Sequence, residues 1–591
     1  MYFEYPIDTK MLLRKKRQIK RELLENGTTY IKKKIAIFGG STTDEIADQL
    51  ELFLLNYGIR PVIYQSEYGR YMEDALFGNP ELDSFHPDIV FIHTSWRNIN
   101  ELPTPEKPTD EILCMLETEY QRFVNIWESI GEKYGCPIIQ NNFDRPNYRL
   151  FGNQDISDIH GRTNFIARLN QKLYEYCQEH NNFYINDLDY LASDYGLSAW
   201  SDSLYWHMYK YAMCLDAIPH LADSVAKIIK AIYGKNKKAM VLDLDNTLWG
   251  GVIGDDGVEG IAVGPEVPSG QIYSEFQEYC KAQKSIGVIL GIDSKNDEEN
   301  AIAGLNHPDG VLRPDDFVCI KANWNPKDGN LIQMAEELSL GVDSFVFIDD
   351  IPAEREIVKK HVSGVAVPEL GKIESFIRTI DHSGFFEVVS LSAEDFQKTE
   401  MYHAKADASK HIATFRNYGE YLESLAMKAT IKPFEEIYVQ RIAQLTNKSN
   451  QFNLTSLRCS EDDIWKMIKS DKYITLYGKL EDKFGDNGVV SVVAGEIIKD
   501  TLHIRLWLMS CRVLKRGMED AMMDVLMTKA KECGITTVYG YYYPTTKNGM
   551  VKNFYNDMNY ERQVNGDNGS IWKITTEKYQ SKSSHIVVID R

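Results

Sequence analysis

Residues 240–257 of the 591-residue chain read MVLDLDNTLWGGVIGDDG, and this stretch decides the central part of the fold. An apolar run surrounds Asp243 and Asp245, and the polar residues Asn246 and Thr247 then end it. This pattern predicts a buried parallel strand whose carboxyl end presents two carboxylates at the edge of an α/β sheet. Two acidic side chains at one strand end can share a divalent cation, and such oxygen ligands suit magnesium.

Three further segments follow in an order that suits one chemistry. The apolar run GVILGIDS (287–294) ends at Ser294, NWNPKD (323–328) places Lys327 before a helical segment, and SFVFIDD (344–350) ends in two acids. A hydroxyl and a cation can hold phosphoryl oxygens, and a second acidic pair adds ligands for a metal. Coincidental strand ends in an unrelated α/β domain are the alternative interpretation.

This order of segments resembles the haloacid dehalogenase (HAD) superfamily of phosphatases. The resemblance implies that Asp243 is the nucleophile that takes the phosphoryl group and that Asp245 is the general acid and base. It also implies that Ser294 and Lys327 hold the phosphoryl oxygens. The Mg²⁺ ligands that the resemblance implies are Asp243, Asp245 through its main-chain carbonyl, Asp349 and Asp350.

The amino-acid sequences of these segments point to a more specific resemblance. DLDNTLWGGVIGDDG (243–257), SKN (294–296) and FIDDIPAERE (347–356) are similar to the FkbH-like branch of that superfamily. Proteins of that branch make glyceryl thioesters on acyl carrier proteins from 1,3-bisphosphoglycerate, which implies an enzyme with Mg²⁺ as cofactor and a carrier protein as partner. QLTNKSNQFNLT (444–455) and SCRVLKRG (510–517) match the same pattern, and a polar network that fixes loops between domains is the alternative interpretation.

Length and composition limit the remaining possibilities. With 591 residues, 43% of them hydrophobic and 26% charged, the chain predicts three or four globular domains. A formal net charge of −20 argues against a general nucleic-acid binder. Nine scattered cysteines without a C-x-x-C pair fit a reducing cytoplasm and give no zinc site. We expect a cytoplasmic protein, because there is no apolar run of membrane-spanning length and no signal-peptide core.

Residues 1–236 are predicted to form an α/β domain. KKIAIFGGSTT (33–43) is an apolar strand that breaks at Ser41, and this pattern resembles the SGNH hydrolases, in which that serine attacks esters. The expected asparagine motif reads HTSWRN (93–98), and the nearest Asp-His pair, Asp202 and His207, has the wrong spacing. We therefore expect a degenerate SGNH-like domain that binds or docks, with an active esterase as the alternative. A basic amphipathic helix over 12–24 is expected to pack on this domain instead of on anionic lipid.

Residues 237–385 are predicted to form the HAD-like domain, with a minimal cap and a closing strand at SGVAVP (363–368). Residues 386–591 resemble the GNAT acyltransferase fold: a helix over 435–455, antiparallel strands, a glycine turn that opens a helix, then strand and helix. That family holds a pantetheine-bearing pyrophosphate on such a turn, so the resemblance implies a phosphopantetheine arm on the turn that precedes the second helix. The residues of that turn are Arg512, Lys515, Arg516 and Gly517.

Cys511 precedes this basic turn, and a nearby helix start and cations lower a thiol pKa. Glyceryl loading needs a thiol at the acyl carbon, and either the carrier's pantetheine attacks directly or Cys511 holds the glyceryl group first. A buried structural cysteine is the alternative interpretation. Two other functions stay open for the whole chain: a plain phosphatase acting on a sugar phosphate or related ester, and a carrier-protein docking scaffold.

Overall fold

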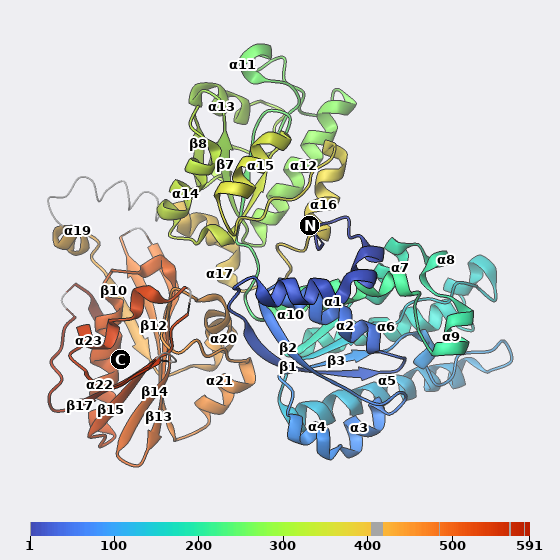
Figure 1. Cartoon of the computed structure of the whole chain (residues 1–591), viewed down its shortest axis with the longest axis horizontal. Helices are drawn as coiled ribbons and strands as arrows, with labels where there is room; N and C mark the ends of the chain where they lie inside the picture. Colours follow the sequence, from blue (N-terminus) through green and yellow to red (C-terminus); the bar gives the residue numbers. More distant parts are fainter. Residues whose placement is uncertain are drawn as a thin grey trace. The chain divides into compact units, whose positions relative to one another are not determined.

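The computed structural model describes residues 2–403, 418–483, 485–545, 547–566, 569–583 and 585–590, and it shows a mixed α/β, multi-domain protein (Figure 1). The chain divides into two compact units, Met1–Ile232 and Tyr233–Arg591. The first boundary therefore lies close to the predicted one at 236/237. The predicted division at 385/386 falls inside the second unit and stays a prediction.

A five-stranded parallel sheet forms the centre of the first unit, with the strand order β2-β1-β3-β4-β5. The strands are β1 (Ile31–Gly39), β2 (Ile59–Gln65), β3 (Ile89–His93), β4 (Ile138–Asn141) and β5 (Phe183–Asn186). The sequence predicts the first four from the runs KKIAIFGG (33–40), PVIYQ (61–65), PDIVFIHTS (87–95) and PIIQNN (137–142). The fifth was missed because only four residues, FYIN, carry it, which is short for a pattern based on periodicity.

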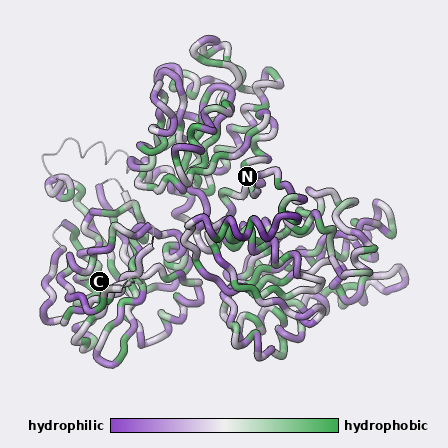
Figure 2. The backbone as a smooth tube through the Cα atoms, viewed as in Figure 1, coloured by the Kyte–Doolittle hydropathy of each residue, from purple (hydrophilic) through white to green (hydrophobic). Residues whose placement is uncertain are grey.

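Helices connect these strands. They are α1 (Thr9–Glu25), α2 (Asp44–Asn56), α3 (Tyr71–Phe77), α4 (Pro80–Phe85), α5 (Thr109–Tyr134), α6 (Arg162–Glu179), α7 (Leu188–Tyr195), α8 (Leu197–Trp200), α9 (Ser203–Tyr209) and α10 (Ile218–Ile232). The basic helix α1 is largely hydrophilic in Figure 2. It packs on α2, burying Leu12 and Ile19, while its Lys16 Nζ lies 2.7 Å from Glu45 on α2. The predicted packing of this helix on its own domain is confirmed.

The HAD-like part has a four-stranded parallel sheet with the order β8-β7-β6-β9. Its elements are β6 (Ala239–Leu242), α11 (Ile253–Asp256), α12 (Pro268–Ser285), β7 (Ile289–Ser294), α13 (Glu298–Leu305), β8 (Cys319–Ala322), α14 (Lys327–Leu338), β9 (Phe345–Ile348), α15 (Pro352–His361) and α16 (Phe376–His382). Only α11 and α12 separate β6 from β7, in keeping with a minimal cap. The predicted closing strand is wrong: Ala366 makes a single bridge to Val346, and Gly364 takes a left-handed φ of 97°.

The rest of the second unit, the part predicted to be GNAT-like, contains a mostly antiparallel nine-stranded sheet. Its strand order is β16-β17-β15-β14-β13-β12-β10-β18, with β11 beside β14. Its strands are β10 (Lys428–Lys432), β11 (Phe452–Asn453), β12 (Tyr473–Asp482), β13 (Gly485–Ile498), β14 (Thr501–Met509), β15 (Thr537–Tyr542), β16 (Glu561–Gly566), β17 (Gly569–Thr575) and β18 (Val587–Asp590). Its helices are α17 (Ala393–Phe396), α19 (Tyr418–Ser424), α20 (Val439–Lys448), α21 (Glu461–Ile468), α22 (Met518–Glu532) and α23 (Phe554–Asp557).

Two parallel pairs interrupt this sheet, β10 with β18 at one end and β14 with β15 in the middle. β14 and β15 run parallel and pair over Thr501–Ile504 and Thr537–Gly540, with α22 as the crossover. The helix predicted over 435–455 ends at Lys448, because the following run of Ser and Asn residues bonds to neighbouring main chain instead of continuing a helix.

Candidate active site

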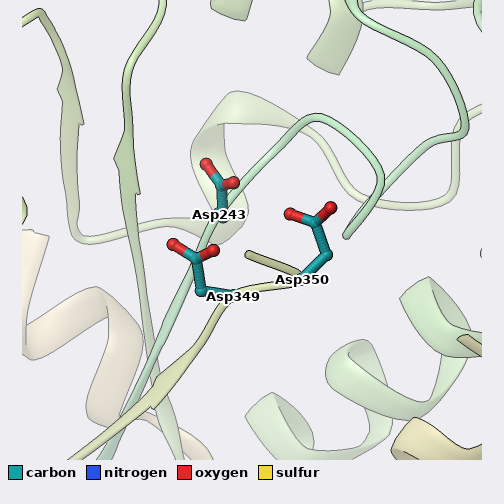
Figure 3. Close-up of side chains that lie close together, drawn as sticks. All are labelled: Asp243, Asp349 and Asp350. Atoms are coloured by element: carbon teal, nitrogen blue, oxygen red, sulfur yellow. The ribbon is translucent and has the colours of Figure 1, made fainter. Parts of the chain in front are cut away.

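Three carboxylates meet where two neighbouring strands of the HAD-like sheet end. β6 leads into Asp243 and β9 leads into Asp349 and Asp350, and the two strands pair in parallel up to Leu242 and Ile348. One oxygen from each carboxylate lies within 4.8 Å of the others, and Figure 3 shows the three side chains converging. This is the arrangement that parallel register produces, because the carboxyl ends of both strands open on the same edge.

Lys327 supplies the positive charge of this site. It is the first residue of α14 and is 2% exposed; its Nζ lies 3.0 Å from Asp243 Oδ1 and 2.5 Å from Asp349 Oδ2. Burial alone would lower the Lys327 pKa, but the two carboxylates outweigh it and raise the pKa. The ammonium therefore stays charged and bridges the two strand ends.

One cation does not balance three carboxylates. Burial, and then repulsion from Asp243, raise the pKa of Asp349, and the same causes raise that of Asp350 to about 6. Among the described residues the buried Asp350 Oδ1 has no hydrogen-bond partner. An unpartnered oxygen beside two more carboxylates is a donor set that a divalent cation satisfies. Arg355 fixes this strand end by donating to the carbonyls of Asp349 (2.7 Å) and Asp350 (2.9 Å).

Asp245 lies apart from the three converging carboxylates. Asn246 follows it with a left-handed φ of 55°, which turns the chain sharply at the strand end. Trp249 Nε1 (2.8 Å), the Ile253 amide (3.1 Å) and Asn296 Nδ2 (3.2 Å) donate to its carboxylate, and burial raises its pKa. Its side chain is therefore not among the candidate metal ligands, in line with the expectation that only its main chain would take part.

Ser294 ends β7 and is buried, next to β6 in the sheet. Sequence reasoning did not single out its neighbour Asp293, which is fully buried and accepts from Asn330 Nδ2 at 2.9 Å. Burial raises the Asp293 pKa to about 7. The signal available in the sequence was an acid inside an otherwise apolar run, GVILGIDS, but that pattern alone does not separate a site residue from a strand end.

The predicted pantetheine turn follows β14. Lys515 is exposed with a left-handed φ of 64°, and Gly517, with φ of 83°, precedes α22. Arg516 is 7% exposed and pairs with Asp482 at the end of β12, so its charge is already matched within the protein and its predicted phosphate contact has a competitor. The side chain of Arg512 lies outside the described residues.

Cys511 begins a short 3₁₀ turn, η8 (Cys511–Val513), and not the helix α22 itself. Its half-buried side chain packs against the apolar cluster of the HAD-like part that includes Val241 and Val318. The cysteine therefore touches the same compact core as strand β6. This environment agrees with the structural interpretation and leaves the predicted catalytic role untested.

The chain itself fills the gap where β14 and β15 diverge. β11 pairs with the end of β14, the Leu454 amide donates to the Trp507 carbonyl (3.0 Å), and the Tyr543 amide donates to the Leu454 carbonyl (2.9 Å). Asn548 Nδ2 donates to the Asn453 carbonyl at 2.8 Å. Residues 452–454 thus bond to β14 and to Tyr543, the residue after β15, so this part of the polar run 444–455 makes contacts inside the sheet.

The first unit has a second set of polar residues at strand ends. Ser41 follows β1 and is 2% exposed, and among the described residues its Oγ has no hydrogen-bond partner. Asn98 Nδ2 donates to the Gly40 carbonyl (2.7 Å), so the asparagine of HTSWRN does lie beside the serine loop. Asp202 instead caps α9 by accepting from the Leu204 amide at 2.7 Å.

Known proteins match both units. Residues 34–230 match the family model "FkbH, N-terminal domain", which lies in the first domain, where the sequence resemblance was loosest. The crystal structure of the N-terminal part of protein BF1531 from Bacteroides fragilis, containing a phosphatase domain complexed with Mg, is 29% identical; the match covers 64% of this chain and 99% of that one with a TM-score of 0.59. The expected resemblance to the FkbH-like family is confirmed. No curated protein matches the chain.

Acetyltransferase structures also match parts of the chain. The GNAT domain of S. lividans PAT is 16% identical over 27% of this chain and 99% of its own, with a TM-score of 0.22. The ribosomal-protein-S18-alanine N-acetyltransferase from Escherichia coli is 11% identical over 25% of this chain and 94% of its own, with a TM-score of 0.21. In the described part of the chain, no helix combines the length and apolar character that crossing a bilayer requires.

Proposed function

We propose that the chain is a Mg²⁺-dependent enzyme that removes the phosphate ester of 1,3-bisphosphoglycerate and loads the glyceryl group onto the thiol of an acyl carrier protein. The FkbH-type domain and the phosphatase-containing neighbour from Bacteroides fragilis support a phosphatase-type function. The observation that carries the proposal is the convergence of Asp243, Asp349 and Asp350 around a buried lysine.

The donor set of the site fits magnesium. Asp243, Asp349 and Asp350 offer oxygen ligands at one strand edge, and the unpartnered Asp350 oxygen is otherwise costly to bury. The main-chain carbonyl of Asp245 would complete the protein ligands. When bound, the ion offsets the charge that otherwise keeps an anionic nucleophile away from a phosphate.

The phosphoryl chemistry then falls to two aspartates. An Asp243 oxygen attacks phosphorus, the bond to the glyceryl oxygen breaks, and Asp245 gives that leaving oxygen its proton. Asp245 next takes a proton from the water that releases phosphate from Asp243. The raised pKa of Asp245 suits a group that must hold and return a proton. Ser294 and Lys327 would hold the phosphoryl oxygens meanwhile.

The acyl phosphate end needs a different reaction. A thiolate attacks the carbonyl carbon, a carbon–sulfur bond forms, and the acyl carbon's bond to the phosphate oxygen breaks as phosphate leaves. Asp243 cannot supply this step, since its attack on the acyl phosphate's phosphorus would release the free acid. We place this step at the GNAT-like part, with the carrier's phosphopantetheine near Lys515 and Gly517, and either direct attack or transfer through Cys511.

One experiment tests the proposal. The chain, a holo carrier protein, 1,3-bisphosphoglycerate and Mg²⁺ are incubated together, and the intact mass of the carrier is measured. A mass gain of one glyceryl group is the expected result, and EDTA should abolish it or leave a phosphoglyceryl adduct. Phosphate release without any adduct would make the chain a plain phosphatase acting on a sugar phosphate or related ester. If neither product forms, the chain would be a carrier-protein docking scaffold.

A further inference from the structure

Two cations of the first unit flank one tryptophan ring. The Arg97 guanidinium, in the 3₁₀ turn η1 (Trp96–Asn98) after β3, lies 4.7 Å from the Trp96 ring centre and 4.8 Å from that of Trp206 on α9. The Lys210 ammonium lies 5.4 Å from the same Trp206 ring. We call these four residues the arginine–tryptophan cluster.

Neither cation forms an ion pair with an acid in the part of the chain that the structure describes. Among the described residues, no hydrogen bond or ion pair of the Arg97 guanidinium or the Lys210 ammonium is found, and the buried Arg97 Nε has no hydrogen-bond partner. Burial lowers the Arg97 pKa and outweighs the negative charge of Asp144, which would raise it, yet the ordinary value is so high that the charge remains. The Asp144 carboxylate accepts hydrogen bonds from the Trp96 amide (3.0 Å) and Trp200 Nε1 (2.9 Å).

The loop after β1 is hydrogen-bonded to the two segments that carry this cluster. The Thr42 amide donates to the Lys210 carbonyl (3.0 Å), and Asn98, next to Arg97, donates to the Gly40 carbonyl (2.7 Å). This loop leads into the 13-residue helix α2, whose N-cap residue Thr43 uses its hydroxyl on Gln65 and leaves the first helical amides without a side-chain cap. The loop that leads into α2 is therefore bonded to both segments that carry the cluster, while the first turn of α2 carries its own acids, Asp44 and Glu45.

We propose that the arginine–tryptophan cluster binds a phosphate group. A guanidinium presents its N–H groups in a plane that matches two phosphate oxygens, and the two indole faces hold that plane in one orientation before any ligand arrives. Lys210 adds a second charge, which suits a dianion better than a single carboxylate. Leaving a half-buried guanidinium without a partner costs free energy that an anionic ligand recovers.

The ligand chemistry has two sources. A phosphate monoester metabolite would bring a dianion directly, and the phosphopantetheine arm of a carrier protein would bring a phosphodiester with one negative charge. Both would be held through phosphate oxygens. The site is separate from the three carboxylates of the second unit and does not depend on the proposed reaction, so binding is measured without turnover.

The experiment is calorimetric titration of the full chain, with EDTA present so that the metal-free carboxylates of the second unit repel phosphate. Inorganic phosphate, 3-phosphoglycerate and the methyl ester of phosphopantetheine, a phosphodiester with the single charge of a carrier-bound arm, are titrated in turn. We expect saturable binding of at least one of them, weakened at least about tenfold by Arg97→Gln and less by Arg97→Lys, which keeps the charge but loses the planar fork. Arg562→Gln is the matched control, because Arg562 also stacks on a tryptophan, Trp572, at 4.5 Å.

The three probes separate the sources. Preferential binding of 3-phosphoglycerate or inorganic phosphate assigns the site to small phosphate monoesters, and preferential binding of the phosphopantetheine methyl ester assigns it to a carrier arm. Thermal melts of each variant establish that it is folded, and Lys210→Gln, which leaves the Arg97 stack in place, serves if Arg97→Gln does not fold. Binding that survives both substitutions, or no binding of any probe by the wild-type chain, overturns the proposal.

Discussion

Two parallel sheets of this protein end in polar residues, yet of these two edges one gathers carboxylates and the other does not. At the edge of β6 and β9, three carboxylates lie within 4.8 Å of one another around a buried lysine. At the edge of β1 and β3, Ser41 has no partner among the described residues and His93 accepts from Asn141 Nδ2 at 2.9 Å. Burial lowers the His93 pKa to about 4, so it is neutral near pH 7. The carboxyl edge of a sheet offers a place for chemistry, and we infer that converging carboxylates are what equip one edge for phosphoryl transfer.

The strongest test of this contrast is Asp243→Asn, which keeps the shape of the side chain but removes the nucleophile and one charged metal ligand. We expect phosphate release from the ester to fall by at least about 10³-fold. If the acyl step lies elsewhere, the carrier should still gain a phosphoglyceryl group, which intact-mass measurement separates from glyceryl. Glu336→Gln, an exposed acid on α14, is the matched control for loss of charge.

Two outcomes of that experiment would contradict the assignment. No acylated carrier at all would mean that dephosphorylation and transfer are obligately coupled, and the two-site account would be wrong. Plain glyceryl on the carrier would mean that Asp243 is not the nucleophile. Asp349→Asn should also lose phosphate release, because it weakens metal binding while leaving the nucleophile in place.

The second test concerns the free-energy cost of burying the Asp293 carboxylate near the end of β7. The folded-state pKa of Asp293 is about 7, above its ordinary value. The folded state therefore holds this proton more tightly than the unfolded chain, and the free energy of unfolding falls as pH rises from the ordinary pKa towards 7. Asp293→Asn removes the charge. We expect the free energy of unfolding of the variant to equal that of the wild type near pH 4. Above pH 7 it should exceed the wild-type value by on the order of 4 kcal/mol at most, as measured by denaturant unfolding of the full chain.

Asp316, another acid of the HAD-like part, serves as the control because its pKa is shifted in the opposite direction. Burial would raise the pKa of Asp316, but the hydrogen bonds from Lys284 (2.5 Å) and the Arg313 amide (2.8 Å) outweigh it and lower the pKa. Asp316→Asn should therefore cost stability at neutral pH, and the cost should shrink as pH falls through the range where the carboxylate takes its proton. The same pH trend in both variants would refute the electrostatic explanation.

The third test asks whether Cys511 belongs to the chemistry. Its side chain packs against the core of the HAD-like part, so we expect the carrier's thiol to attack directly. Cys511→Ser should keep glyceryl loading within about twofold and lower stability by about 1 kcal/mol, because a hydroxyl replaces a thiol in apolar surroundings. A glyceryl adduct on wild-type Cys511, found by peptide mass spectrometry and absent from the variant, would establish the covalent route instead.

The charged edge was predictable and its surroundings were not. Parallel strands carry near-continuous apolar runs, so Asp243 and Asp349 could be placed at one edge from the sequence. Asp293 could not be assigned, because its environment depends on Asn330, which is distant in sequence. The segment 452–454 was predicted as part of a helix, since its bonds to β14 and β15 are tertiary contacts that no local pattern records.

The smallest effect is expected at the edge of β1 and β3, where Ser41→Ala tests whether the first unit catalyses anything. A serine needs a base to become a nucleophile, and Asp202 is engaged in capping α9. Glyceryl loading by the second unit should stay within about twofold, since the buried hydroxyl takes no part in either reaction step. Because a buried hydroxyl without a partner is costly, the variant should be at least as stable as the wild type in thermal melts. Ester hydrolysis is measured with a chromogenic acetate ester. If the wild-type chain hydrolyses the ester and Ser41→Ala does not, this edge is an active site. Convergence of carboxylates would then not be what distinguishes the catalytic sheet edge from the other one.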